Sequence, residues 1–346
     1  MKAAILKKVG VIEIEEVPIP SPGPAEVLVK IKSVGICGSD LHYYTHGKIG
    51  AYVVEKPIIL GHEASGEVVA VGKDVTRFKI GDRVTMEPGI PCRKCEFCKT
   101  GRYNLCPDVA FMATPPYDGA FTEYIVSPED FTFKIPDTMS FDEAALMEPL
   151  AVGVYAAERS AMRPGMTAAV LGLGPIGMVV AQAAKAYGAN RVIGTDVVDY
   201  RLARAKGFAV DNAFNAKDSA VEEQIIADLG RRPDVVFETS GNATSIQMTT
   251  SLVKMGGTVV MIGMSPEDLM LMNHGQISGK ELNILGLFRY ANMYLKAIEL
   301  VQLGRINLRD LVTKEFSLEQ TKEALDYAIA QKDHSIKVMI HPSSQN

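Results

Sequence analysis

The five cysteines of the chain divide into a cluster of four and one isolated residue. The cluster, with the spacing C-x2-C-x2-C-x7-C, consists of Cys92, Cys95, Cys98 and Cys106. Two intervening residues let neighbouring thiolates turn toward one ion, and four thiolates complete a closed tetrahedral zinc shell. The alternatives are unligated thiols or an iron–sulfur cluster, for which a proline after the last cysteine is typical. Pro107 is such a proline, but the polar residues around the cluster favour a structural zinc in a surface loop.

The isolated cysteine, Cys37, is followed at a distance by the adjacent pair His62 and Glu63. A thiolate, an imidazole and a carboxylate are all good zinc ligands, and three protein ligands plus a water form a catalytic zinc site. Each residue also has an ordinary interpretation, since a lone cysteine commonly fills a core and a lone histidine is more often structural. From the spacing alone, the three residues could form one zinc site, or they could be unrelated, and neither interpretation is favoured.

A glycine-rich segment in the middle of the chain has the pattern of a dinucleotide-binding unit. An apolar strand over 168–171 leads into Gly172-Leu173-Gly174-Pro175-Ile176-Gly177, a helix over 178–187, and a second strand over 191–195 that ends in Asp196. The acid follows the last glycine by 196 − 177 = 19 positions, close to the roughly 20 of a dinucleotide fingerprint.

Each residue of this segment has a physical role in the interpretation. Gly172 permits the tight turn, Gly174 lets a pyrophosphate approach the backbone, and Gly177 lets the helix pack on the sheet. The helix N-terminus offers free N–H groups to phosphates, and Asp196 accepts hydrogen bonds from the adenosine ribose. The alternative is a glycine-rich turn that binds nothing.

Composition restricts the partners. The chain has 346 residues, 47% hydrophobic and 22% charged, with a net charge of −5 and no basic block longer than a pair. These values predict a globular protein of two domains and argue against nucleic acid or an anionic membrane as the main partner. No signal peptide and no apolar run of the ~20 residues of a membrane span are visible. Five cysteines without a secretory signal favour a cytoplasmic location.

The hydrophobic pattern changes along the chain. Short strands over 25–32, 66–71 and 83–86, with Gly/Asp turns, predict a small barrel or sandwich. Helices are predicted over 141–150 and 152–160, with Ser140 and Glu143 as a capping box. Strands over 234–238, 258–262 and 281–287 and a helix over 243–254 then predict an α/β, doubly wound parallel sheet. Helices over 294–303 and 318–330 and a strand over 337–340 follow.

Several stretches resemble the zinc-dependent medium-chain dehydrogenases, and within them the sorbitol (L-iditol) and xylitol dehydrogenases. The likeness covers nearly the whole chain. It lies in GICGSDLHYYTHGKIG (35–50), LGHEASGEVVAVG (60–72), GDRVTMEPG (81–89), CKTGRYNLCP (98–107), ATPPYDGAF (113–121), LMEPLAVG (146–153), LGLGPIGMV (171–179) and GLFRY (286–290).

The resemblance implies a GroES-like β-barrel catalytic domain that holds both zincs and a Rossmann domain that binds NAD. The first would comprise 1–153 and 288–346, and the second 154–287, with the substrate in the cleft between them. The resemblance also implies a homo-oligomer, either a tetramer or a dimer.

The resemblance further assigns residues to the active site. It places the catalytic zinc on Cys37, His62 and Glu63. Where related alcohol dehydrogenases use a second cysteine, this chain has Glu148, which would lie beside the metal or act as an alternate ligand. This departure points to the polyol branch.

Ser39, with Glu148 and water, would relay the proton. The substrate would contact Tyr43, Phe111, Thr114, Glu148, Arg289 and Tyr290, although Phe111 could be a core residue and Arg289 a surface ion-pair residue. The NAD site would comprise Gly172, Gly174, Pro175, Ile176, Gly177, Asp196 and Arg201.

The implied activity is transfer of a hydride from a secondary hydroxyl, typically C2, of a polyol such as sorbitol or xylitol to NAD, giving a ketose. A bound zinc makes a hydroxyl more acidic, and a carboxylate among its ligands leaves it more tolerant of oxygen ligands. Asp196 would repel a 2′-phosphate, so NAD is expected over NADP. The alternatives are an L-threonine or 2,3-butanediol dehydrogenase, or a zinc- and nucleotide-binding protein without catalysis.

Overall fold

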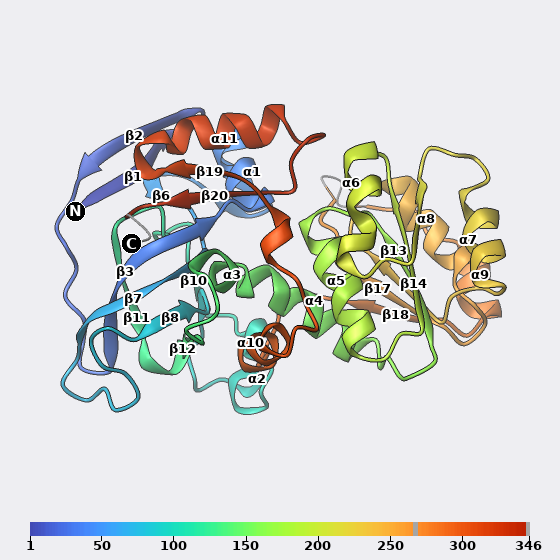
Figure 1. Ribbon diagram of the computed structural model, residues 1–346, viewed down its shortest axis with the longest axis horizontal. Coiled ribbons are helices and arrows are strands. Elements are labelled where there is room, and N and C mark those ends of the chain that lie inside the picture. Colours follow the sequence, from blue (N-terminus) through green and yellow to red (C-terminus); the bar gives the residue numbers. More distant parts are fainter. Residues whose placement is uncertain (266–268, 344–346) are drawn as a thin grey trace. The chain divides into compact units, whose positions relative to one another are not determined.

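The computed structural model of the protein describes residues 1–265 and 269–343 (Figure 1). The chain forms two compact units. The first contains Met1–Glu148 and the segment from Leu308 onward, and the second contains Pro149–Asn307. Among the described residues, no helix has both the length and the apolar character needed to cross a membrane.

The first unit is built on a seven-stranded sheet with β3 (Glu26–Gly35) near its centre. Val27, Val29 and Ile31, which alternate along this strand, are fully buried in the core of the unit. The sheet order is β12-β8-β7-β3-β20-β19, and β11 also pairs with β3. The other strands are β7 (Glu63–Val71), β8 (Arg83–Met86), β11 (Tyr124–Pro128), β12 (Thr132–Lys134), β19 (Val312–Ser317) and β20 (Lys337–His341).

Smaller elements complete this unit. A second sheet has the order β2-β1-β6. The short elements are β1 (Lys2–Lys8), β2 (Val11–Glu16), β4 (Lys48–Ile49), β5 (Tyr52–Val53), β6 (Ile58–Ile59), β9 (Gly89–Ile90), β10 (Ala110–Phe111), α1 (Gly38–His46), α2 (Glu96–Lys99), α3 (Phe141–Ala145) and α11 (Thr321–Ala330). Because β20 pairs antiparallel with β3, the end of the chain joins the sheet formed by its beginning.

The second unit contains a six-stranded sheet in which all pairs are parallel, in the order β15-β14-β13-β16-β17-β18. Its helices lie on both sides of the sheet, as Figure 1 shows for α5 and α7. The elements are β13 (Thr167–Leu171), α5 (Pro175–Ala186), β14 (Arg191–Asp196), α6 (Asp199–Arg204), β15 (Asn212–Asn215), α7 (Val221–Leu229), β16 (Val235–Glu238), α8 (Ala243–Leu252), β17 (Thr258–Met261), α9 (His274–Gly279), β18 (Asn283–Gly286) and α10 (Tyr294–Gln302). The predicted doubly wound sheet is confirmed.

The predicted strands and helices agree with the structure in most places, and one difference has a clear cause. The predicted capping box at Ser140 and Glu143 is present. The break between the two following helices lies at Leu146 and not near 151, because α4 (Met147–Arg159) begins early. Pro149 does not prevent this, since a first helical turn needs no N–H from it.

The boundaries of the compact units differ from the 153/154 and 287/288 implied by the resemblance. They lie after Glu148 and after Asn307. The segment after β18 belongs to the second unit because the side chain of Gln182 on α5 donates to and accepts from the backbone of Asn307, at 3.0 and 2.6 Å. An ion pair between Lys296 on α10 and Glu158 also lies within this unit.

Candidate active site

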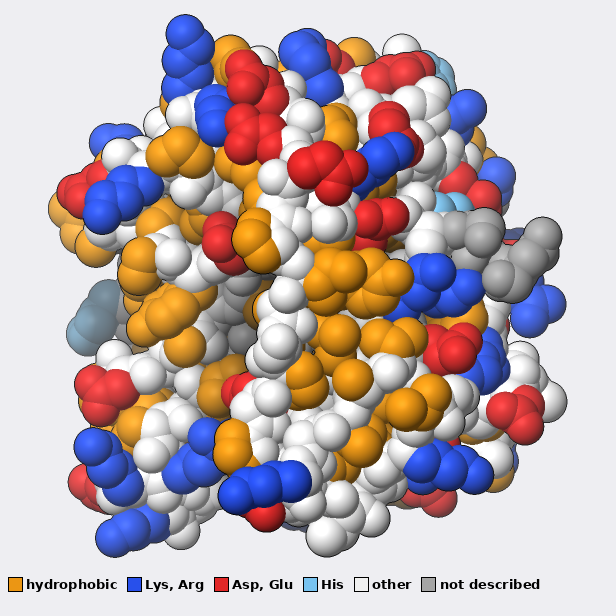
Figure 2. Space-filling model, turned by 90° about the vertical axis from the view of Figure 1, so that its left-hand side faces the viewer, with side chains coloured by type: hydrophobic (Ala, Val, Ile, Leu, Met, Phe, Trp, Pro, Cys, Tyr) orange, Lys and Arg blue, Asp and Glu red, His pale blue; other side chains and the backbone are white. Residues whose placement is uncertain are grey.

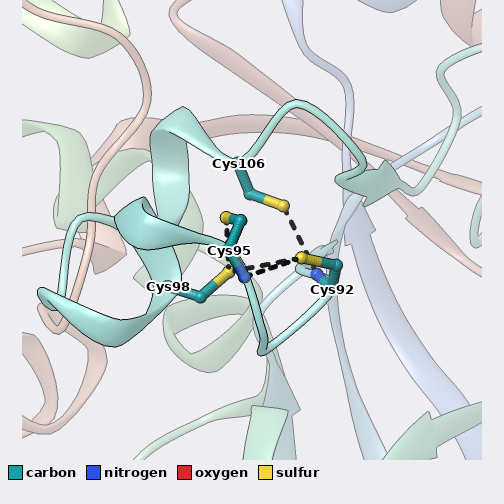
Figure 3. A group of neighbouring side chains, drawn as sticks. All are labelled: Cys92, Cys95, Cys98 and Cys106. Atoms are coloured by element: carbon teal, nitrogen blue, oxygen red, sulfur yellow. Dashed lines mark hydrogen bonds between the residues drawn. The ribbon is translucent and has the colours of Figure 1, made fainter.

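The four clustered cysteines converge in a loop of the first unit (Figure 3). Their sulfur atoms all lie within 4.8 Å of one another. The Sγ atoms of Cys92 and Cys98 are 3.9 Å apart, and those of Cys95 and Cys98 are 3.4 Å apart. A tetrahedral zinc with bonds of about 2.3 Å sets its sulfurs about 3.8 Å apart. The arrangement therefore fits a closed zinc site.

A buried carboxyl group connects this loop to the barrel. Tyr103, between the third and fourth cysteines, donates a hydrogen bond of 3.1 Å to Oε2 of Glu87, which is 3% exposed. Burial, assisted by the charge of Glu148, raises the pKa of Glu87 to about 8, against the opposing effect of the Tyr103 hydroxyl. The four-cysteine loop therefore rests on a carboxyl group that is mostly protonated at neutral pH.

A second group of zinc-type ligands brings Cys37, His62 and Glu63 together, again with all ligand atoms within 4.8 Å of one another. Cys37 precedes α1, His62 precedes β7, and Glu63 is the first residue of β7. Gly35, at the end of β3, is the register partner of Glu63. The pairing of β3 with β7 therefore joins residues that are more than twenty positions apart in the sequence.

Asp40 orients the first two members of this group. One carboxylate oxygen accepts a 2.9 Å hydrogen bond from the backbone N–H of Cys37, and the other accepts one of 2.9 Å from Gly61 and lies 3.7 Å from Nδ1 of His62. Burial disfavours a charged imidazole, but the charges of Asp40 and Cys37 outweigh it and raise the pKa of His62 well above its usual value. Such an outer carboxylate fixes the orientation of a ligand histidine.

Lys337 on β20 contacts Glu63, the third residue of this group. Its ammonium group donates to both carboxylate oxygens of Glu63, at 2.7 and 2.8 Å, and to the carbonyl oxygen of Ile36 at 3.1 Å. Both charged side chains are almost fully buried. Burial lowers the pKa of this lysine, but Glu63 outweighs it and the pKa is raised overall. One thiolate, one imidazole and one carboxylate fit a zinc ion with a fourth position open to substrate.

The glycine turn of the second unit has the expected geometry. Gly172 has φ of +99°, which favours glycine, and a Cβ on Gly177 would lie 1.8 Å from the carbonyl oxygen of Gly172. A Cβ on Gly174 would meet only a guanidinium nitrogen of Arg201, at 3.9 Å. Pro175 and Ile176 form the first turn of α5. The backbone at Gly174 is thus open to a ligand while Gly172 and Gly177 hold the turn.

A cavity of about 850 Å³ opens beside this turn, at the carboxyl ends of β13, β14 and β16. Asp196 lies in its wall with one carboxylate oxygen on the N–H of Leu173, at 2.8 Å, and the other on those of Val197 and Val198, at 2.8 and 2.9 Å. Arg201 lies 3.6 Å from Asp196. Parallel sheets bind dinucleotides at this kind of position.

Comparison with known proteins identifies the family of the chain. Residues 23–137 match the alcohol dehydrogenase GroES-like domain, and residues 175–302 match the zinc-binding dehydrogenase domain. The chain is 48% identical to sorbitol dehydrogenase of Bacillus subtilis over 344 residues, which covers 99% of this chain and 98% of that one. The chain belongs to the zinc-binding dehydrogenases.

Two solved structures of this family resemble the fold closely. One is an Escherichia coli oxidoreductase of unknown specificity, with a TM-score of 0.95, 39% identity and 99% of each chain covered. The other is 2R,3R-butanediol dehydrogenase from Bacillus subtilis, with a TM-score of 0.91, 32% identity and 99% of each chain covered. The predicted GroES-like barrel and Rossmann domain are confirmed.

The remaining predicted site residues divide between the two units. In the first, Ser39 and Tyr43 lie on α1, Phe111 packs its ring 5.6 Å from that of His62, and Thr114 donates its backbone N–H to Phe111. Glu148 is buried at the start of α4. Arg289 and Tyr290 lie in the second unit, after β18. Tyr290 packs against Tyr294, and Arg289 over the ring of Phe288.

Sequence reasoning missed three residues that organise the two cysteine-containing sites of the first unit, namely Asp40, Glu87 and Lys337. Asp40 had a usable signal, because it stands three positions after Cys37, where a capping-box acid is expected. Lys337 had a weaker one, as a cation at the start of an otherwise apolar strand. Glu87 had none in its own segment, because its partner Tyr103 belongs to a different loop.

Proposed function

We propose that the protein is an NAD-dependent zinc polyol dehydrogenase that oxidises a secondary hydroxyl, typically at C2, of a substrate such as sorbitol or xylitol to a ketone. The observation that carries the proposal is the convergence of Cys37, His62 and Glu63. It is supported by the near full-length likeness to a sorbitol dehydrogenase.

The proposed roles follow from the chemistry of the side chains. Zinc, when bound to this set, would polarise the substrate hydroxyl and lower its pKa. Ser39, half-buried on the first turn of α1, would accept the hydroxyl proton and pass it to solvent with the help of Glu148. The nicotinamide of NAD would accept the hydride. Glu148 replaces the second cysteine of related alcohol dehydrogenases, and we assign it a place next to the ligands.

The polyol preference rests on hydrogen-bonding groups. Tyr43, Thr114, Arg289 and Tyr290 would contact the substrate, together with Phe111. A site built to pair with several hydroxyls rejects alcohols that lack them, by roughly 10⁴-fold or more, because its own polar groups would be left unpaired. Ethanol should therefore be a very poor substrate.

The test is the initial rate of NAD reduction with sorbitol, xylitol, galactitol, ribitol, L-threonine, 2,3-butanediol and ethanol. Arg289→Ala should lower kcat/KM for the polyol but leave NAD binding unchanged, whereas Arg305→Ala, at an exposed arginine of the same unit, should change neither. Efficient ethanol oxidation, or full polyol activity in Arg289→Ala, would contradict the assignment.

The likeness to 2R,3R-butanediol dehydrogenase keeps a vicinal diol as a second candidate substrate, and L-threonine contains a comparable secondary hydroxyl. A preference for either in the same panel would replace the polyol. A protein that binds zinc and NAD but oxidises none of these compounds would instead be a non-catalytic binding protein.

We also propose a cytoplasmic homo-oligomer, either a dimer or a tetramer. The oligomer is supported by an apolar groove of about 610 Å³ on the first unit. Its wall includes Pro18, Pro20, Ile59, Pro88 and Tyr124. Figure 2 shows hydrophobic side chains gathered near the middle of one face of the molecule. Large exposed apolar areas commonly mark protein interfaces. Sedimentation equilibrium of the pure protein at several concentrations would test it.

A further inference from the structure

The ammonium group of Lys337 and any metal on Glu63 compete for the same carboxylate. Lys337 has three N–H donors, and all three are used: two on the carboxylate oxygens of Glu63 and one on the carbonyl oxygen of Ile36. Lys337 is 3% exposed and Glu63 is 1% exposed. No solvent screening separates this pair.

The sheet fixes this geometry from both sides. Lys337 begins β20, which pairs with the last residues of β3, and Glu63 begins β7 on the other side of β3. A Cβ on Gly35, which lies between them, would be 2.0 Å from Oε2 of Glu63. The carboxylate of Glu63 therefore occupies space that is free only because Gly35 has no Cβ, and from there it reaches the ammonium group of Lys337.

We propose that Lys337 is a positioning residue that holds Glu63 partly away from the metal, so that Glu63 is a weak and exchangeable ligand. The inference rests on the zinc site of the proposed function. In the metal-free protein, the ammonium group of Lys337 pairs with the carboxylate of Glu63. With zinc bound, the positive charge of Lys337 would repel the cation. Its hydrogen bonds would also leave the oxygens of Glu63 less able to bind the metal.

Removing the charge should strengthen metal binding. In Lys337→Met, the metal-free state loses the cation that pairs with Glu63, and the loaded state loses a repulsion, so both effects favour the metal. Outer partners of ligands typically change metal affinity by roughly 10- to 100-fold when removed, and we expect a change of about tenfold or more toward tighter binding. A lysine that only supports the fold would give the opposite sign, because a loosened site binds metal more weakly.

The experiment is zinc competition against a chromophoric chelator, with the full-length protein. The same titration of Cys37→Ser gives the contribution of the four-cysteine site, which is subtracted. Lys337→Met should bind zinc more tightly at the Cys37 site and should melt at a lower temperature when metal-free. Lys337→Arg, which keeps the charge, should bind zinc as the wild type does.

A matched control comes from the second unit. Lys280 also directs its ammonium group at three acceptors, the carbonyl oxygens of Thr250, Ser251 and Val253, but at no carboxylate. Lys280→Met should leave zinc affinity unchanged. If Lys337→Met does not fold, Lys337→Gln provides the same test, since it removes the charge and keeps a donor.

The outcomes separate the inference from the proposed function. Weaker or unchanged zinc binding in the neutral Lys337 variants, with a normal Cys37 site in the wild type, would overturn the inference alone. Equal zinc content in wild type and Cys37→Ser would overturn the metal site itself.

Discussion

The glycine turn of the second unit allows binding and stability to be separated by two nearly identical substitutions. In Gly174→Ala, the new Cβ would have one neighbour within 4 Å, a nitrogen of Arg201 at 3.9 Å. The backbone there, with φ of −69° and ψ of −176°, suits alanine. We therefore expect the stability to change by no more than about 1 kcal/mol.

The methyl group of Gly174→Ala would occupy the space that a pyrophosphate needs. Loss of one hydrogen bond to a charged group costs about 1.5–3 kcal/mol, so the dissociation constant for NAD should rise by roughly 10- to 100-fold. Gly177→Ala is different, because its Cβ would lie 1.8 Å from the carbonyl oxygen of Gly172. Relief of that overlap requires the start of α5 to move, at a cost of about 1–3 kcal/mol or more.

Calorimetric titration with NAD and thermal melting, with and without NAD, would measure both effects. Gly177→Ala should melt several degrees lower even without NAD, at about 2–4 °C per kcal/mol for a unit of this size. Gly207→Ala, where a Cβ would meet nothing within 4 Å, is the control. Wild-type NAD affinity in Gly174→Ala, or wild-type melting in Gly177→Ala, would refute the argument.

Three further predictions concern the buried carboxyl group, the four-cysteine loop and the ribose site. The pKa of Glu87 is raised from 4.5 to about 8, so the folded state binds this proton more tightly than the unfolded state does. The free energy of unfolding should therefore fall as the pH rises from 4.5 to about 8, by at most roughly 5 kcal/mol. In urea unfolding from pH 5 to 9, the free energy of unfolding of Glu87→Gln should decline less with pH than that of the wild type. Cys98→Ser should remove one of two zincs per chain and lower the melting temperature. Cys37→Ser should abolish turnover with little change in the melting temperature. A wild type with one zinc per chain, and the same zinc content in Cys98→Ser, would contradict the closed four-cysteine site. The wild type should strongly prefer NAD over NADP, and equal kcat/KM with the two cofactors would contradict this preference. Asp196→Ser should reduce the preference for NAD. In that variant Arg201, which lies 3.6 Å from Asp196, would face a 2′-phosphate without the competing carboxylate.

Features that depend on short spacings could be predicted from the sequence. The four cysteines lie within one loop, and the strand, glycine turn, helix and acid of 168–196 follow one another without interruption. The capping box at Ser140 is equally local. In each case the residues that act together are near neighbours in the chain, so their types and spacing determine the local geometry.

The site around Cys37 needed more than its spacing. Cys37 and His62 meet because β3 pairs with β7, and their separation in the sequence does not determine that register. The resemblance to the family supplied the grouping at the sequence level. The structure supplied its physical cause, together with Asp40, whose carboxylate joins the backbone of Cys37 to the ring of His62.

Only the tertiary structure brought Lys337 to Glu63 and Glu87 to the four-cysteine loop. Lys337 lies 274 positions from Glu63, and it reaches that carboxylate because the final strand of the chain returns to the sheet built by the first. Glu87 acquires its raised pKa from burial, which depends on how the loop containing Tyr103 packs over it. Apolar periodicity predicts that a strand exists, but the partner of a buried charge is determined by which distant strands pair and in which register.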